Sequence, residues 1–142
     1  MSTENDGKYR QLMTIPAWAI DENGHVNNVQ YLQWMQDIAV SHYSDMGGSA
    51  PTQSLGATWV VRSHMIEYFR PAFEGDEIEV RTWVVNLRRV RSRRRYEFSR
   101  KDDGSLLVKG ETDWVFVDVA SGRPLAIPEN IAGLFTLVPD EG

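Results

Sequence analysis

The sequence predicts an α+β domain in which an antiparallel sheet covers one long helix. Apolar residues recur at steps of three and four in only one long segment, 28–46. The strongly patterned segments after it alternate between apolar and polar residues, as strands do. A lone helix with one apolar face needs a sheet to cover it. With 142 residues, we expect a single domain over 1–142 and an ordered core at about 9–135.

The expected elements follow the chain in a simple order. Residues 9–19 form a first strand, and a turn-rich stretch at 21–25 leads into the helix at 28–46. Asn27 or Asn28 caps the start of that helix. Four strands in a meander are then expected over 59–69, 77–85, 93–100 and 106–119, followed by a helical turn within 127–135.

Composition excludes several classes of protein. There is no cysteine, which removes disulfides, thiolate metal sites and cysteine nucleophiles. The three histidines lack metal-ligand spacing, so no metal site is expected. The net charge of −5 disfavours a dedicated nucleic-acid binder. No segment is long and apolar enough to span a membrane, and the polar first ten residues do not read as a secretory signal. We therefore expect a cytoplasmic protein.

The densest cluster of chemically capable side chains lies at 21–31, between the first strand and the helix. A helix N-terminus presents free backbone N–H groups and partial positive charge, which can stabilise an oxyanion. Asp21 lies seven residues before Asn28, close enough in a folded loop to face the same point. A carboxylate at that place can activate water or attack directly. The alternative is that Asp21 only shapes the turn.

Residues 21–31 read Asp-x-Asn-x-His-Val-Asn-Asn-x-x-Tyr, which resembles the signature of hotdog-fold thioesterases, the 4-hydroxybenzoyl-CoA thioesterase group. The string is closer still to bacterial long-chain acyl-CoA thioesterases and plant acyl-carrier-protein thioesterases. The similarity continues through segments 67–76, 114–118 and 122–124, and covers about 9–135. The resemblance implies a hotdog fold, in which about five antiparallel strands wrap around one central helix.

The resemblance also implies roles for four residues. Asp21 corresponds to the catalytic carboxylate, and the N–H of Asn28 corresponds to the group that polarises the thioester carbonyl. Asn23 and His25 match members of the catalytic set proposed for the plant enzymes. Near the place of a further acidic residue of that set this chain has Pro71, which is a departure. The plant enzymes carry two hotdog repeats, so a chain with one repeat implies a homodimer with sites between protomers.

Several side chains near this cluster keep alternative interpretations. His25 can orient a ligand, act in catalysis or pin the loop. Tyr31 and Met35 lie on the apolar face of the helix, where an acyl chain is expected to run. Glu67 falls on the more apolar face of its strand, where a carboxylate can support catalysis, although a position at the rim is favoured.

A second notable segment is 88–95, which holds six arginines in eight residues. One interpretation is a solvated hairpin loop. The other is phosphate binding, because arginine matches phosphate geometry. The candidate ligands are then the phosphates of coenzyme A or the acidic surface of an acyl carrier protein. The residues assigned to this site are Arg89, Arg91, Ser92 and Arg93.

These observations predict a thioesterase that hydrolyses an acyl-CoA or acyl-carrier-protein thioester, in fatty acid metabolism, with no cofactor beyond the coenzyme A of the substrate. We expect a homodimer or a homotetramer made of two dimers. The alternatives are a hotdog-fold dehydratase or hydratase acting on 3-hydroxyacyl thioesters, and a non-catalytic acyl-CoA-binding module. The acyl group and the choice between nucleophile and general base stay open.

Overall fold

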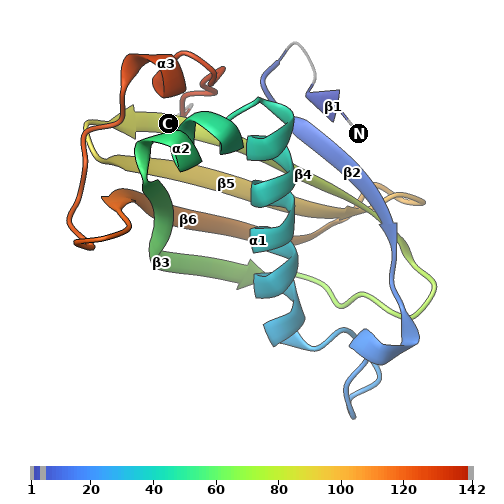
Figure 1. Cartoon of the computed structure of the whole chain (residues 1–142). Helices are drawn as coiled ribbons and strands as arrows, with labels where there is room; N and C mark the ends of the chain where they lie inside the picture. The colour runs from blue at the N-terminus through green and yellow to red at the C-terminus, as the bar shows by residue number, and fades with distance from the viewer. Residues whose placement is uncertain (1, 4–5, 141–142) are drawn as a thin grey trace.

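A computed structural model describes residues 2–3 and 6–140 as one antiparallel sheet with a long helix packed across it (Figure 1). The strands are β1 (Ser2–Thr3), β2 (Tyr9–Thr14), β3 (Ala57–Tyr68), β4 (Glu77–Arg88), β5 (Arg91–Arg100) and β6 (Leu106–Asp118). The helices are α1 (Asn28–Asp45), α2 (Ser49–Leu55) and α3 (Glu129–Ala132), with a 3-10 turn at Ala17–Ala19. The strand order is β1-β2-β4-β5-β6-β3. This arrangement confirms the α+β class and the hotdog fold.

The apolar face of α1 forms the centre of the core, as its periodicity predicts. Its buried residues are Tyr31, Met35, Ile38, Ala39 and His42. Met35 is fully buried and packs on Gly110 of β6, where an added Cβ would lie 2.7 Å from the Met35 sulfur. A glycine at this position lets the helix approach the sheet closely.

The expected meander is wrong in one respect. β4, β5 and β6 pair in order, but β3 pairs with β6 and forms the edge of the sheet. Alternation in a sequence shows which face a residue takes, not which strand lies beside it. Residues 69–76 connect β3 to β4 and can extend about 26 Å, enough to cross the three strand spacings of about 5 Å that separate them.

Other expected boundaries also change. The first strand ends at Thr14 rather than at residue 19, and the chain enters the 3-10 turn after Pro16. The short helix α2 was not expected. Contacts extend beyond the expected core of 9–135, because Thr3 pairs with Tyr9 and the Val138 N–H donates to the Val84 carbonyl. Residues 1, 4–5 and 141–142, which belong to the expected tails, lie outside the described residues.

A membrane-spanning helix needs about 20 mainly apolar residues. Within residues 2–3 and 6–140, no helix has the length and apolar character that a crossing needs.

Candidate active site

The Asp21 loop is a tight turn stabilised by its own backbone. Ile20 and Val26 form an isolated antiparallel bridge, and the Asp21 N–H donates to the His25 carbonyl at 3.0 Å. The Gly24 N–H donates to the Asp21 carbonyl at 3.0 Å, and Gly24 has φ +83°. A residue without Cβ adopts this conformation at least cost. The loop therefore holds Asp21 in a defined position beside the start of α1.

The half-buried carboxylate of Asp21 is used only in part by this turn. Its Oδ1 accepts the Asn23 N–H at 2.9 Å, and no described residue donates to Oδ2. Oδ1 of Asp21 thus helps to shape the turn, and Oδ2 is available to act on a substrate or a water. The Asn23 residue is exposed, and His25 Nδ1 lies 3.3 Å from the Val26 carbonyl.

The N-terminus of α1 begins at Asn28, whose backbone N–H lies before the first hydrogen bond of the helix. Asn27, and not Asn28, is the cap: its side chain accepts the Val29 N–H at 3.0 Å, and its own N–H donates to the Ala19 carbonyl. Asn28 is the first helical residue, and among the described residues nothing accepts its N–H. The Tyr68 hydroxyl donates to the Asn28 carbonyl at 3.1 Å and ties the end of β3 to this junction.

The four residues predicted to be catalytic, Asp21, Asn23, His25 and Asn28, all belong to this loop and helix start. Glu67 is exposed on β3, opposite Lys109. No group of three or more His, Asp or Glu side chains that could hold a metal ion occurs in the part of the chain that the structure describes.

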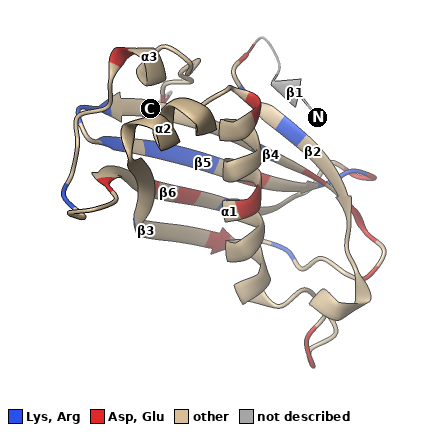
Figure 2. Ribbon diagram, viewed as in Figure 1, with Lys and Arg blue, Asp and Glu red and all other residues tan. Residues whose placement is uncertain are grey.

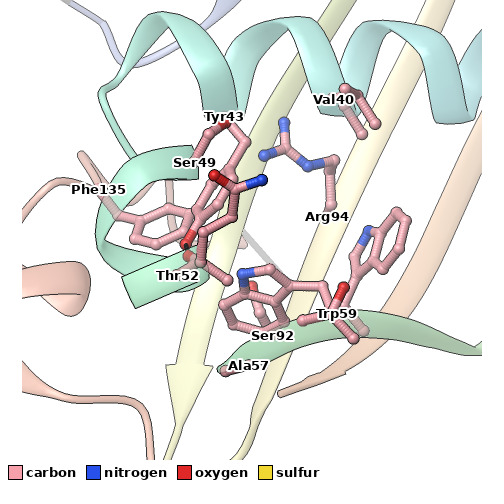
Figure 3. Close-up of a pocket in the computed structure, with 13 residues that line it drawn as sticks. Val40, Tyr43, Ser49, Thr52, Ala57, Trp59, Ser92, Arg94 and Phe135 are labelled. Atoms are coloured by element: carbon pink, nitrogen blue, oxygen red, sulfur yellow. Dashed lines mark hydrogen bonds between the residues drawn. The ribbon is translucent and has the colours of Figure 1, made fainter. Parts of the chain in front are cut away.

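A pocket of about 250 Å³ lies further along α1, between the helix layer and the sheet (Figure 3). Its wall combines four aromatic side chains with small and polar residues. The lining residues are Ala39, Val40, Tyr43, Ser49, Thr52, Gln53, Ala57, Thr58, Trp59, Ser92, Arg94, Trp114 and Phe135. Tyr31 and Met35, predicted to contact an acyl chain, do not line this pocket and are buried in the core of the protomer.

The arginine-rich segment is not a loop, which corrects the first interpretation of it. Arg88 ends β4, residues 89–90 form the turn, and Arg91–Arg100 form β5. Strand alternation separates the residues assigned to phosphate binding. Ser92 is buried on the helix-facing side, whereas Arg93 lies on the opposite side, where its Nε donates to Asp113 at 3.1 Å.

Carboxylates of β6 pair with most arginines on the outer side of β5, and Figure 2 shows these charged strands side by side. Arg91 and Arg93 pair with Asp113, and Arg95 pairs with Glu111. The hydrogen bond to Asp113 raises the pKa of Arg93. At the turn, Arg88 and Arg89 are exposed, and none of the described carboxylates forms an ion pair with either.

Arg94 is the functional candidate that the sequence-based prediction missed. It lies on the buried side of β5 and is only 4% exposed. Its Nη1 lies 2.8 Å from His42 Nδ1 and donates to the Thr82 hydroxyl at 3.1 Å. The signal was present in the alternation, because Arg94 shares its phase with Tyr96 and Phe98, which are buried.

Comparison with known proteins gives a family to this arrangement. The model of the Thioesterase-like superfamily matches residues 15–135. The chain belongs to this superfamily. The matched region contains α1, the Asp21 loop, the pocket and strands β3 to β6.

Individual curated proteins are similar to this chain at low identity. A palmitoyl-acyl carrier protein thioesterase of Gossypium hirsutum is 24% identical over 132 residues, covering 88% of this chain and 32% of that protein. The chain thus spans about a third of the length of this curated relative.

Solved structures with the same fold are also similar to this chain. A 1,4-dihydroxy-2-naphthoyl-CoA thioesterase from Synechocystis superposes with a TM-score of 0.81 at 22% identity, covering 90% of this chain and 95% of that one. A Staphylococcus aureus protein in complex with CoA also gives a TM-score of 0.81, at 19% identity, covering 89% of this chain and 80% of that one.

Proposed function

We propose that this protein hydrolyses an acyl thioester of coenzyme A or of an acyl carrier protein to a carboxylic acid and a thiol. The observation that carries the proposal is the junction of the Asp21 loop with α1, in a member of the Thioesterase-like superfamily. There a carboxylate with one uncommitted oxygen adjoins a helix N-terminus whose first N–H, at Asn28, has no acceptor among the described residues.

In the proposed reaction the thioester carbonyl oxygen accepts the Asn28 N–H, which polarises the carbonyl. The partial positive charge of the helix N-terminus stabilises the negative charge that develops on that oxygen. Asp21 then either removes a proton from an attacking water or attacks the carbonyl itself to form a mixed anhydride, which water hydrolyses in a second step. In both routes the C–S bond breaks, and the thiolate leaves and takes up a proton. Asn23 and His25 follow Asp21 in the same turn and are proposed to orient the water or the carbonyl.

We further propose that the active form is a homodimer built on the edge strand β3. This strand pairs only with β6, and its other edge is open among the described residues. Antiparallel pairing of two copies about the middle of β3 places Val60 opposite Met65 of the second copy. Both side chains are apolar, and they are 41% and 56% exposed in the protomer. Pairing would cover an edge and two apolar side chains that water otherwise meets.

This dimer would also bring together parts that lie far apart in one protomer. The Asp21 loop and the β4–β5 turn lie at opposite ends of the sheet (Figure 1). In this pairing, the end of β3 in the second copy would lie near Ala57 of the first. Tyr68 at that end of β3 is bonded to the start of α1, which follows the Asp21 loop, so the Asp21 loop of the second copy would also approach Ala57. Ala57 lines the pocket at the end of the sheet that carries Arg88 and Arg89. Those two exposed arginines are the proposed phosphate contacts, so each site would use both copies.

The test is thiol release across a panel of acyl-CoA and acyl-carrier-protein substrates, for the wild type and for Asp21→Asn. We expect the substitution to lower kcat by about 100-fold or more, because general acid–base groups contribute on that scale. Glu22→Gln is the matched control, since Glu22 is the exposed neighbour of Asp21 in the same turn. Equal activity of Asp21→Asn and wild type would contradict the role of Asp21. A wild type that binds thioesters without releasing thiol would support the binding module instead.

A further inference from the structure

The proposed reaction at Asp21 leaves the buried guanidinium of Arg94 unexplained. Its two hydrogen-bond acceptors, His42 and Thr82, are both neutral. Burial and the positive charge of Arg94 lower the pKa of His42 to about 3, so His42 carries no charge near neutral pH. No described carboxylate forms an ion pair with Arg94, and no described residue accepts a hydrogen bond from its Nε or Nη2.

The missing counter-charge sets Arg94 apart from its neighbours in β5. Burial lowers the pKa of Arg94 to about 10, which still leaves it protonated at neutral pH. Arg93 and Arg95, on the opposite face of the same strand, each pair with carboxylates. A buried charge without a partner is costly, whereas an arginine and a carboxylate can join through two parallel hydrogen bonds. A ligand that enters beside Arg94 can supply this partner.

The pocket provides the route to Arg94. Figure 3 shows Arg94 extending from β5 into the space below α1. Tyr43, Trp59 and Phe135 line the same pocket. Among the described residues, the buried indole N–H of Trp59 has no acceptor either. The volume of about 250 Å³ is near the lower end for ligand sites, which suits a small acyl group.

We propose that this pocket selects acyl groups that end in a carboxylate, which Arg94 binds through Nε and Nη2. The proposal rests on the proposed function, because the thioester end of the same acyl group would point toward the Asp21 loop of the second copy. The aromatic side chains would contact the carbon chain or ring between the two ends. An acyl group with an apolar end would bury Arg94 without a counter-charge and would therefore bind less well.

The experiment compares acyl-CoA pairs that differ only in the terminal group: adipoyl with hexanoyl, suberoyl with octanoyl, and para-carboxybenzoyl with benzoyl. We expect the wild type to favour the carboxylate member of at least one pair by about tenfold or more in kcat/KM, since a charged hydrogen bond contributes on that scale. In Arg94→Met the preference should disappear or reverse, and in Arg94→Lys part of it should remain. Arg95→Met is the matched control, because Arg95 adjoins Arg94 and faces the other side of the sheet.

A second readout needs no turnover. Trp59 and Trp114 line the pocket, so tryptophan fluorescence is titrated with adipate and hexanoate for the wild type and Arg94→Met. Binding of adipate that depends on Arg94, without hydrolysis of any thioester, would keep the pocket assignment and reject the proposed reaction. Hydrolysis with no preference for a terminal carboxylate, or with a preference for the apolar member, would overturn the inference and leave the proposed function intact. The wild-type preference decides the question even if Arg94→Met fails to fold.

Discussion

At the residue scale, Asn28 has a role that its side chain does not explain. Asn27 caps the helix, so the side chain of Asn28 is not needed for the helix start. What the proposed reaction requires of Asn28 is its backbone N–H. A substitution that changes only the side chain should therefore leave activity almost unchanged, whereas one that removes the N–H should lower it.

Asn28→Ala retains the N–H and should retain most activity, whereas Asn28→Pro should lower kcat by about 100- to 1,000-fold. Proline is well tolerated at the first position of a helix, and Asn27 already has the extended conformation, φ −61° and ψ 129°, that a following proline requires. Thiol release measures the effect, and circular dichroism checks that both variants are folded. A folded Asn28→Pro enzyme with full activity would exclude the N–H as the oxyanion donor.

At the element scale, the contact between α1 and β5 depends on a neutral histidine. His42 is 3% exposed, stacks on Tyr9 at 5.0 Å and lies against Arg94. In the folded protein His42 therefore stays neutral at pH values where the same histidine of the unfolded chain, with its ordinary pKa of 6.5, takes up a proton. Because the unfolded state binds more protons between pH 6.5 and about 3, the free energy of unfolding falls as the pH falls through that window.

We expect His42→Asn to flatten this dependence. The asparagine oxygen can replace Nδ1 as the acceptor for Arg94 but does not titrate. Relative to the variant, the wild type should lose up to about 1.4 kcal/mol of unfolding free energy per pH unit below pH 6.5. Urea denaturation between about pH 4 and pH 7, at fixed protein concentration, measures the difference. Burial also lowers the pKa of His64, so the comparison uses the difference between the two proteins and not the wild-type slope. Parallel curves would contradict the prediction.

At the scale of the whole molecule, the open edge of β3 decides whether the proposed site is complete. The proposed pairing places Val60 opposite Met65 of the second copy. Lysine at both positions would bring like charges together at two symmetric places, which disfavours the pairing.

We therefore expect Val60→Lys combined with Met65→Lys to shift the solution mass from twice the 16.2 kDa of the chain to that of one copy. Thioesterase activity should fall with it, because each site would need both copies. Light scattering with size-exclusion chromatography measures the mass, and thiol release measures activity. Leu12→Lys is the control, since Leu12 is an exposed apolar residue on β2, away from the β3 edge. A double variant that stays dimeric and active would exclude this interface.

The spacing of apolar residues and the turn-rich stretch before them determined α1, the α+β class and the position of the Asp21 loop. Steps of three and four residues fix one face of a helix, and a capping asparagine fixes its start, so both are local properties. The helix was expected at 28–46 and is found at Asn28–Asp45. The four residues assigned to the catalytic site lie in that same junction because they are near neighbours in the sequence.

Only the tertiary structure decided which strands are neighbours and which arginines find a carboxylate partner. β3 pairs with β6, which the connection between β3 and β4 allows because it is long enough to cross the sheet. Alternation in the sequence carries no information about such crossings. The arginine-rich segment looked like one charged loop, but a strand sends successive side chains to opposite faces. Arg93 therefore meets Asp113, and Arg94 enters a pocket whose described lining residues include no carboxylate. The sequence supplied these charges, and the strand neighbours determined which of them found a partner.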